Sequence, residues 1–343
     1  MITIKDVADK AGVSIGTVDR VLHKRGRVSP KTAERINRVI RQTHYRPNIF
    51  ASRLSKSKTY RFGVFIPELP QDSRYWESVG HGIDRAGNEL KPYHVKIRYF
   101  CYDRFSKGSF ERTGARLLRS KSDGVLLAPV LTQPVHSFLK SGRLGPYVFV
   151  DASIPDTRPL AFIGQDSFQS GAVAARLMDI LVPVGGEIAI FSAVSGDYHI
   201  DRRAEGFLSY FKNREESIRR YNLENVKIQD AFEGLLARVL RESSNLKGIF
   251  ITNAATHVAA RALESHQAGR KIALIGYDLI EENVAFLKRG VIDFLISQKA
   301  EMQGYLGIQA LYRHLVLKES VEENVMMPID IITKENLVYC NGY

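Results

Sequence analysis

The sequence predicts an α/β protein in two parts, a small all-α three-helix head followed by a larger domain of two doubly wound parallel-sheet lobes. Three observations lead to this prediction. Residues 3–22 hold two short amphipathic segments joined at a glycine, residues 1–58 hold most of the positive charge, and β-rich apolar runs alternate with helical segments from Tyr60 onward. The first two indicate a nucleic-acid-binding head. The third is typical of parallel sheets covered by helices.

The N-terminal stretch predicts a helix-turn-helix. Thr3 and Asp6 form a capping box for the first helix, Gly12 allows the left-handed turn that ends it, and Ser14 caps a second helix over residues 15–23. The alternative is an ordinary helical hairpin in a core. The apolar residues at helical spacing are Val7, Ala8, Ala11, Val18, Val21 and Leu22.

The charge distribution favours the first of these alternatives. The first 58 residues hold 14 Lys and Arg but only four Asp and Glu, so +10 of the net charge of +12 lies there. A small domain this basic suits phosphates. A third helix over residues 30–43, capped by Ser29, would complete the head. The segment 48–57 that follows is either a floppy linker or a short helix that folds when it pairs with its copy on DNA.

From Tyr60 onward, apolar strands and helices alternate. The strands are expected at Arg61–Pro67, Val95–Tyr102, Gly124–Val130, Tyr147–Asp151, Phe162–Gln165, Glu187–Phe191, Gly248–Thr252, Ala273–Tyr277 and Phe294–Ser297. The helices are expected at Tyr75–Leu90, Phe110–Lys121, Ser167–Leu181, Arg202–Asn213, Ala231–Ser243, Ala255–His266, Glu281–Arg289 and Lys299–Leu317. This number of strands is large for one sheet, so two lobes are expected, with a ligand cleft beyond the carboxyl ends of the strands.

These segments resemble the LacI/GalR family of bacterial transcriptional regulators. The match consists of IKDVADKAGVSIGTVDRVL and VSPKTAERINRVIRQTHYRPN within the first 50 residues, then RAEGF from Arg203, GYD ending at Asp278, and Gln298 with Gly304. The resemblance implies a DNA-binding head, a hinge helix and a sensor domain like periplasmic binding proteins of type I. It also implies a homodimer that reads a palindromic operator in double-stranded DNA.

The resemblance also implies domain boundaries. The head is expected over residues 1–46, the hinge over 47–59, and the effector-binding and dimerisation domain over 60–343. The expected N-lobe combines residues of about 60–161 and 294–320, and the expected C-lobe combines residues of about 162–293 and 321–343.

Residues that contact DNA follow from the same resemblance. Arg20 can donate two hydrogen bonds to guanine, Asp19 replaces a frequent serine and either accepts from cytosine or orients Arg20, and Leu54 is placed to wedge between base steps in the minor groove. The base-reading positions are Ile15, Gly16 and Arg20; the backbone-positioning residues are Ser14, Thr17, His23 and Tyr45; the hinge residues are Asn48, Ala51 and Leu54. Thr3 is a further expected DNA-binding residue.

Effector contacts are implied at the ends of strands and in two helices. The expected residues are Tyr75, Trp76, Asp151, Asp166, Arg203, Asn253, Asp278 and Gln298. Alternatives remain open: Trp76 as a core residue, Asp166 as a helix cap, and Arg203 as the surface partner of Glu205 or Asp201. Ala254 replaces the usual acid after Asn253, which favours a charged or acidic sugar over a neutral hexose.

Other functional classes have less support. The chain holds no Walker loop, no Gly-x-Ser-x-Gly, no His-Glu-x-x-His and no Gly-x-Gly-x-x-Gly, so we expect no catalysis and no cofactor. The alternative is a DNA-binding head on an enzymatic or purely solute-binding cleft domain. Cys101 and Cys340 form no metal-ligand pattern, and no N-terminal or membrane-length apolar run occurs. We therefore expect a cytoplasmic protein without a membrane partner. Its ligand is expected either to release DNA or to promote DNA binding.

Overall fold

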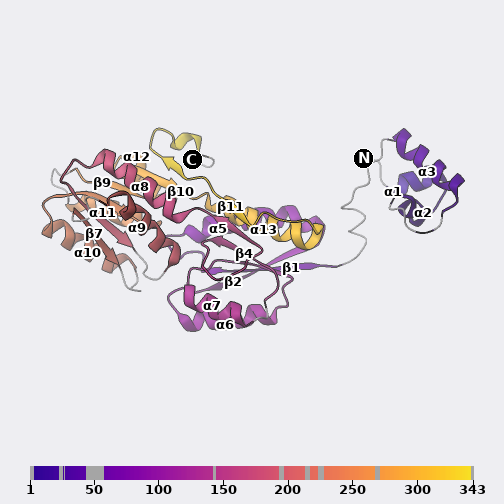
Figure 1. Cartoon of the computed structure of the whole chain (residues 1–343), viewed down its shortest axis with the longest axis horizontal. Coiled ribbons are helices and arrows are strands. Elements are labelled where there is room, and N and C mark those ends of the chain that lie inside the picture. Colours follow the sequence, from indigo (N-terminus) through magenta and orange to yellow (C-terminus); the bar gives the residue numbers. More distant parts are fainter. Residues whose placement is uncertain are drawn as a thin grey trace. The chain divides into compact units, whose positions relative to one another are not determined.

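The computed structural model describes most of the chain as two compact units, Met1–Lys58 and Thr59–Tyr343 (Figure 1). The described residues are 4–22, 26, 28–43, 58–141, 144–192, 197–212, 217–222, 228–266 and 271–340. None of the helices in these ranges combines the length and apolar character that a bilayer-spanning segment needs.

The first unit holds the three expected helices. These are α1 (Ile4–Ala11), α2 (Ile15–Leu22) and α3 (Pro30–Thr43). Gly12 takes a φ of +59° between the first two, and Ser14 Oγ accepts the Thr17 N–H at 3.3 Å to cap α2. One small core unites the helices and consists of Val7, Ala8, Ala11, Val18 and Ile36. The helix-turn-helix prediction is therefore confirmed at the level of secondary structure and packing.

The first sheet of the second unit is entirely parallel, in the order β11-β5-β4-β3-β1-β2. Its strands are β1 (Tyr60–Pro67), β2 (Val95–Tyr102), β3 (Gly124–Leu127), β4 (Tyr147–Asp151), β5 (Ala161–Gly164) and β11 (Asn324–Met326). Its helices are α5 (Tyr75–Leu90), α6 (Lys107–Arg119), α7 (Thr132–Lys140) and α13 (Ala300–Tyr312). Helices α6 and α7 cover the face opposite α5 and α13 (Figure 1).

The second sheet has the order β12-β10-β9-β8-β6-β7 and is parallel except for β12, which is antiparallel to β10. Its strands are β6 (Glu187–Ser192), β7 (Ile218–Asn222), β8 (Leu246–Ile251), β9 (Ala273–Tyr277), β10 (Phe294–Ser297) and β12 (Asp330–Ile332). Its helices are α8 (Ser167–Leu181), α9 (Tyr198–Tyr210), α10 (Ile228–Glu242), α11 (Thr256–His266) and α12 (Glu281–Lys288). Short helical segments also occur at Lys91–Tyr93, Arg313–Leu317 and Leu337–Tyr339.

The lobes differ from the expected boundaries in three strands. β5 and β11 pair in the first sheet, although residues 162–293 and 321–343 were expected in the C-lobe, and β10 pairs in the second sheet, although residues 294–320 were expected in the N-lobe. The chain thus crosses between lobes after β5, after β10 and after β11. A run of apolar residues indicates a strand, but its hydrogen-bonding partner is chosen by tertiary pairing, which the run itself does not encode.

Four elements were not expected from the sequence: α7, β7, β11 and β12. Three of them are sheet-edge strands, and β11 and β12 contain only three residues each. Edge strands are partly exposed and carry polar residues, as IRRYN does in β7, so their apolar signal is weak.

Helices α8 and α9 pack at backbone contact through two glycines. A Cβ on Gly206 would lie 1.9 Å from the carbonyl oxygen of Phe168, and a Cβ on Gly171 would lie 2.0 Å from the carbonyl oxygen of Arg203. The two glycines therefore allow the short distance between α8 and α9. This matters for function because α9 also carries the central side chain of the pocket described below.

Candidate functional sites

Three residues expected to read bases are exposed on α2. Ile15, Gly16 and Arg20 are all exposed, and Ile15 has 46% of its surface accessible, whereas Val18 on the same helix is fully buried. Ser14 and Thr17, expected to position the backbone, hydrogen-bond to each other through their hydroxyls at 2.9 Å. The remaining candidates lie outside the described residues: Thr3, His23, Tyr45, Asn48, Ala51 and Leu54.

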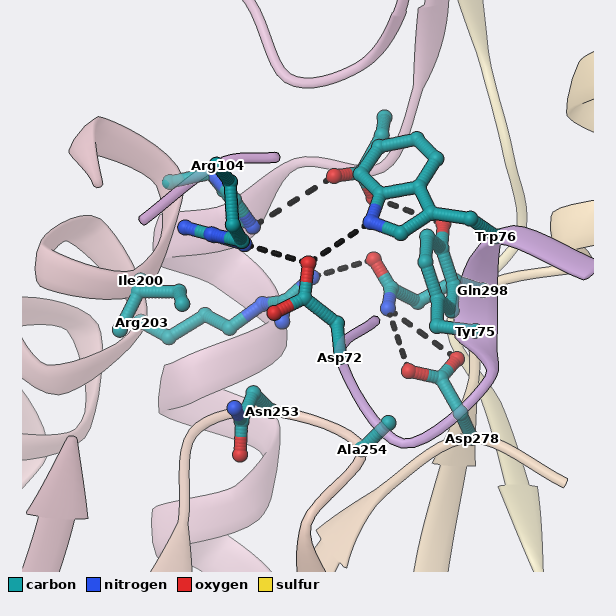
Figure 2. Close-up of a pocket in the computed structure, with 12 residues that line it drawn as sticks. Asp72, Tyr75, Trp76, Arg104, Ile200, Arg203, Asn253, Ala254, Asp278 and Gln298 are labelled. Carbon is teal, nitrogen blue, oxygen red and sulfur yellow. Dashed lines mark hydrogen bonds and ion pairs between the residues drawn. The ribbon is translucent and has the colours of Figure 1, made fainter. Parts of the chain in front are cut away.

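Seven of the eight expected effector residues line one pocket between the lobes (Figure 2). They are Tyr75, Trp76, Asp151, Arg203, Asn253, Asp278 and Gln298. The eighth, Asp166, is not among the lining residues. Its carboxylate accepts the Gln169 N–H at 2.9 Å and caps α8, which is the helix-cap alternative. The lining also includes residues that were not expected to contact a ligand: Asp72, Arg104, His199, Ile200 and Ala254.

Two aspartates enter the pocket at the ends of central strands. Asp151 ends β4 and Asp278 follows β9, with φ of +73° and +69° respectively, so the chain turns sharply at both positions. Asp151 accepts a hydrogen bond from the Tyr75 hydroxyl at 2.7 Å. Asp278 accepts two from the Gln298 side-chain amide, at 2.9 and 3.1 Å. Each carboxylate is thus oriented by a neighbour that also lines the pocket.

Arg203 crosses the floor of the pocket from α9 with only 1% of its surface accessible. Its guanidinium donates to the Thr252 carbonyl oxygen at 2.8 Å and to Gln298 Oε1, and it lies 4.0 Å from the centre of the Tyr277 ring. It is not a surface partner of Glu205 or Asp201, because Arg202 and Arg220 pair with those two carboxylates. That alternative is therefore wrong.

An ion-pair network that was not expected from the sequence closes the opposite side of the pocket. Arg104, in the loop after β2, donates to Asp72 in its own lobe and to Asp197 at the N-terminus of α9 in the other lobe. Trp76 Nε1 also donates to Asp72, at 2.7 Å, which places the indole beside the network rather than in the core alone. His199 Nε2 lies 3.5 Å from Asp151 Oδ2.

A sequence signal for part of this network existed. Asp72 and Arg104 follow β1 and β2, whose carboxyl ends meet the same cleft as β4 and β9. Asp197 and His199 were missed because α9 begins at Tyr198, four residues before the expected start at Arg202. His199 then lies one helical turn before Arg203 and faces the same cleft.

Several polar atoms around the pocket are buried without a hydrogen-bond partner. On the lining residues they are Asp72 Oδ1, Arg104 Nε, His199 Nδ1 and Arg203 Nε. Burying a polar group without a partner costs free energy of about 1–3 kcal/mol. A ligand that both donates and accepts hydrogen bonds would satisfy them. The free cavity is about 30 Å³, whereas pockets for small molecules typically measure about 300–1,000 Å³, so the lobes must part to admit a sugar-sized ligand.

Two family models match the chain, and together they span nearly all of its described structure. Residues 62–319 match the periplasmic binding protein domain, and residues 3–48 match bacterial regulatory proteins of the lacI family. The chain belongs to the LacI family. The ribose operon repressor of Lactococcus lactis is 23% identical over 350 residues, which cover 98% of both chains.

Solved structures agree with this membership of the LacI family. A LacI transcriptional regulator from Bacteroides fragilis is 32% identical, with a TM-score of 0.75 over 82% of this chain and 99% of that one. A solute-binding protein from Burkholderia graminis in complex with D-arabinose has a TM-score of 0.73 over 84% of this chain and 99% of its own, at 19% identity, and therefore shows the shared fold alone. The expected class, a DNA-binding regulator with a periplasmic-binding-protein-like sensor, is confirmed.

Burial shifts the ionisation of the acids in this LacI-family sensor. It raises the pKa of Asp278 to about 7, although Arg203 and the hydrogen bonds from Gln298 act in the opposite direction. It also raises the pKa of Asp197 to about 7 against the pull of Arg104. Burial, together with the nearby Arg203 and Arg104, holds the pKa of His199 well below its usual range, so this imidazole is neutral.

The raised pKa of Asp278 makes stability depend on pH. Its pKa rises from the ordinary 3.8 to about 7 on folding, so the folded state keeps this proton to higher pH than the unfolded state does. The stability that the proton contributes is fully present below about pH 4 and is lost as the pH rises through about 7. Asparagine stays neutral throughout. We therefore expect Asp278→Asn to gain stability relative to the wild type between about pH 5 and pH 8.

Thermal unfolding of both proteins across this pH range measures the effect. A difference in melting temperature that stays constant with pH would show that Asp278 is already ionised at the acidic end of the range.

Proposed function

We propose that this LacI-family regulator represses transcription from a palindromic operator and that a neutral sugar or sugar derivative, bound between the lobes, switches its affinity for DNA. The observation that carries the proposal is the set of buried, unpartnered polar atoms on Asp72, Arg104, His199 and Arg203, all on residues that line the pocket. Sugar hydroxyls both donate and accept, and the indole of Trp76 supplies an aromatic surface beside them.

The charge of the pocket favours a neutral ligand over an acidic one. The absence of an acid at Ala254 suggested a charged or acidic sugar, but the lining holds carboxylates at Asp72, Asp151 and Asp278 against guanidinium groups at Arg104 and Arg203 only. Both guanidinium groups already have acceptors within the protein. Burial already raises the pKa of Asp151, and that of Asp278 to about 7, so negative charge is unfavourable here and an anionic ligand would add to it. The relative named for the ribose operon is consistent with a pentose.

A thermal-shift screen of the full chain tests this ligand class. The panel contains D-ribose, D-arabinose, D-tagatose, D-glucose and D-galactose. The corresponding sugar acids and sugar phosphates are tested separately for comparison. A neutral sugar that binds only the folded state should raise the melting temperature. At a concentration of 100 times its Kd it adds about 2.7 kcal/mol to the free energy of unfolding. Glu205→Gln, on the exposed face of α9, is the matched control and should respond like the wild type. Stabilisation by the acids or phosphates alone would contradict a neutral ligand.

Direct base readout by Arg20 supports the DNA-binding part of the proposal. We expect Arg20→Ala to weaken operator binding by about 1–3 kcal/mol and to relax preference at one symmetric pair of base pairs, because an exposed arginine on α2 can donate two hydrogen bonds to guanine. Lys31→Ala, which removes an exposed cation on α3, should weaken binding to all sequences alike. Selection of binding sites from random DNA measures both. An unchanged sequence preference in Arg20→Ala would refute this role.

The coupling between sensor and head requires a dimer and a hinge. We propose a homodimer, with a head over residues 1–46, a hinge over 47–59 that includes Leu54, and a sensor over 60–343. A ligand that changes the angle between the two lobes would change the spacing of the two hinges, with a coupling free energy of about 1–3 kcal/mol. Within this proposal the cleft binds its ligand without turnover, and the protein acts in the cytoplasm without a cofactor.

A further inference from the structure

We propose that Arg104 and Asp197 form a latch that holds the two lobes together, and that an effector has to break this latch in order to enter the cleft. The latch regulates the pocket assigned above, so its importance for signalling rests on the proposed function. The existence of the latch does not depend on the proposed function, because the contact can be tested in the free protein.

The two side chains of the latch belong to different lobes. Arg104 belongs to the lobe of β1 and β2, and Asp197 belongs to the lobe of α8 and α9. Their side chains are 3% and 1% exposed, so this ion pair is shielded from water and salt. Opening the cleft separates the partners: Arg104 keeps its contact with Asp72 in its own lobe, whereas the Asp197 carboxylate loses its ion-pair partner. Among the ion pairs of the described residues, that of His199 with Asp151 also joins the two lobes, but it is longer at 3.5 Å and involves a neutral imidazole. The pair of Lys299 with Asp330 lies where the chain crosses between the lobes, and its side chains are partly exposed.

Arg104 is also anchored in its own lobe. The same guanidinium donates to Asp72, whose carboxylate also accepts from Trp76 Nε1 at 2.7 Å (Figure 2). Asp72, Ser73 and Arg74 all have left-handed backbones, with φ of +53°, +58° and +65°. Left-handed backbone is unfavourable for residues other than glycine and persists only where surrounding contacts hold it. The Asp72 turn is thus held in place by the bonds that also orient Arg104 toward Asp197.

The cavity between the lobes is too small for a sugar while the latch is formed. With the pair formed, the free cavity is about 30 Å³, and both Arg104 and Asp72 are part of its wall. A pyranose or furanose does not fit into that volume. The lobes must therefore separate before a sugar enters, and separation breaks the contact between Arg104 and Asp197. The latch makes closure in the absence of ligand favourable and raises the ligand concentration needed for a response.

Distances between two spin labels on the full-length free protein test the latch directly. One label replaces Lys107 on α6 and the other replaces Arg238 on α10, both exposed and on opposite lobes, in a background with Cys101 and Cys340 changed to serine. The labelled chain is diluted into an excess of unlabelled protein, so that the distance within one chain is measured, and in the wild-type background we expect a single distance. Asp197→Asn keeps the shape of the side chain but removes its charge, and should add a population at longer distance.

Arg104→Lys is the second variant, because a lysine keeps the charge but lacks the fork that reaches both Asp72 and Asp197. It should show the same longer distance. Glu205→Gln, which breaks an exposed pair on α9, should leave the distribution unchanged. Distributions of Asp197→Asn and Arg104→Lys that superimpose on the wild type would overturn the latch. No sugar or DNA is present, so that result would leave the proposed function standing, whereas failure of the sugar screen would leave the latch standing.

Discussion

Replacing Gly206 by alanine is expected to lower the free energy of unfolding by about 3 kcal/mol, near the upper end for added atoms in a packed core. The added Cβ would lie 1.9 Å from the carbonyl oxygen of Phe168, and that neighbour is backbone, which cannot rotate away. Helix α9 would have to move outward from α8. Because α9 carries His199 and Arg203, the same displacement should weaken any sugar-induced rise in melting temperature.

Gly234→Ala is the matched control for this prediction. Gly234 lies in α10, and a Cβ there meets nothing within 4 Å. Alanine should therefore stabilise the protein by about 0.5–1 kcal/mol, because it has a higher helix propensity and its unfolded chain has less conformational entropy to lose than that of glycine. Urea denaturation of the full chain, followed by circular dichroism, compares the two variants. Equal stabilities of Gly206→Ala and Gly234→Ala would show that α9 tolerates a larger separation from α8.

Arg203→Ala is expected to destabilise the sensor by about 3–5 kcal/mol and to abolish sugar binding. The guanidinium is almost completely buried and holds Gln298 and the Thr252 carbonyl oxygen. Gln298 in turn orients Asp278, so removal of Arg203 disturbs both a ligand contact and its neighbours. Under the proposed function Arg203 has a structural and a binding role at once, and loss of ligand response alone does not separate the two roles.

Two further variants separate these roles. Arg203→Lys keeps the charge but not the forked geometry, and should recover part of the stability while sugar binding measured by calorimetry stays weak. Arg202→Ala, next to it in sequence, removes an exposed partner of Glu205 and should change stability by less than about 0.5 kcal/mol. If Arg203→Lys restores stability and also binds sugar with the wild-type Kd, the guanidinium makes no specific ligand contact.

The sequence by itself determined the class of the protein and the local elements of the head. Periodicity, Gly12, Ser14 and the charge of residues 1–58 all act within one or two helical turns or depend on composition alone, so no distant contact is needed to interpret them. The central strands were also evident, because strands buried on both faces are continuously apolar. Four of the twelve lining residues, Asp151, Asn253, Asp278 and Gln298, stand at the ends of strands, whereas Arg203 was implied by the family resemblance.

Only the tertiary structure decided which strands pair and which charges meet. The assignment of β5, β10 and β11 to lobes depends on hydrogen bonds between strands far apart in sequence. Arg104 and Asp197 are separated by 93 positions, and nothing in the neighbourhood of either indicates the other. Asp166 and Asp151 both follow apolar strands, yet one caps a helix and the other enters the pocket, because the direction of a side chain is set by the backbone turn after the strand.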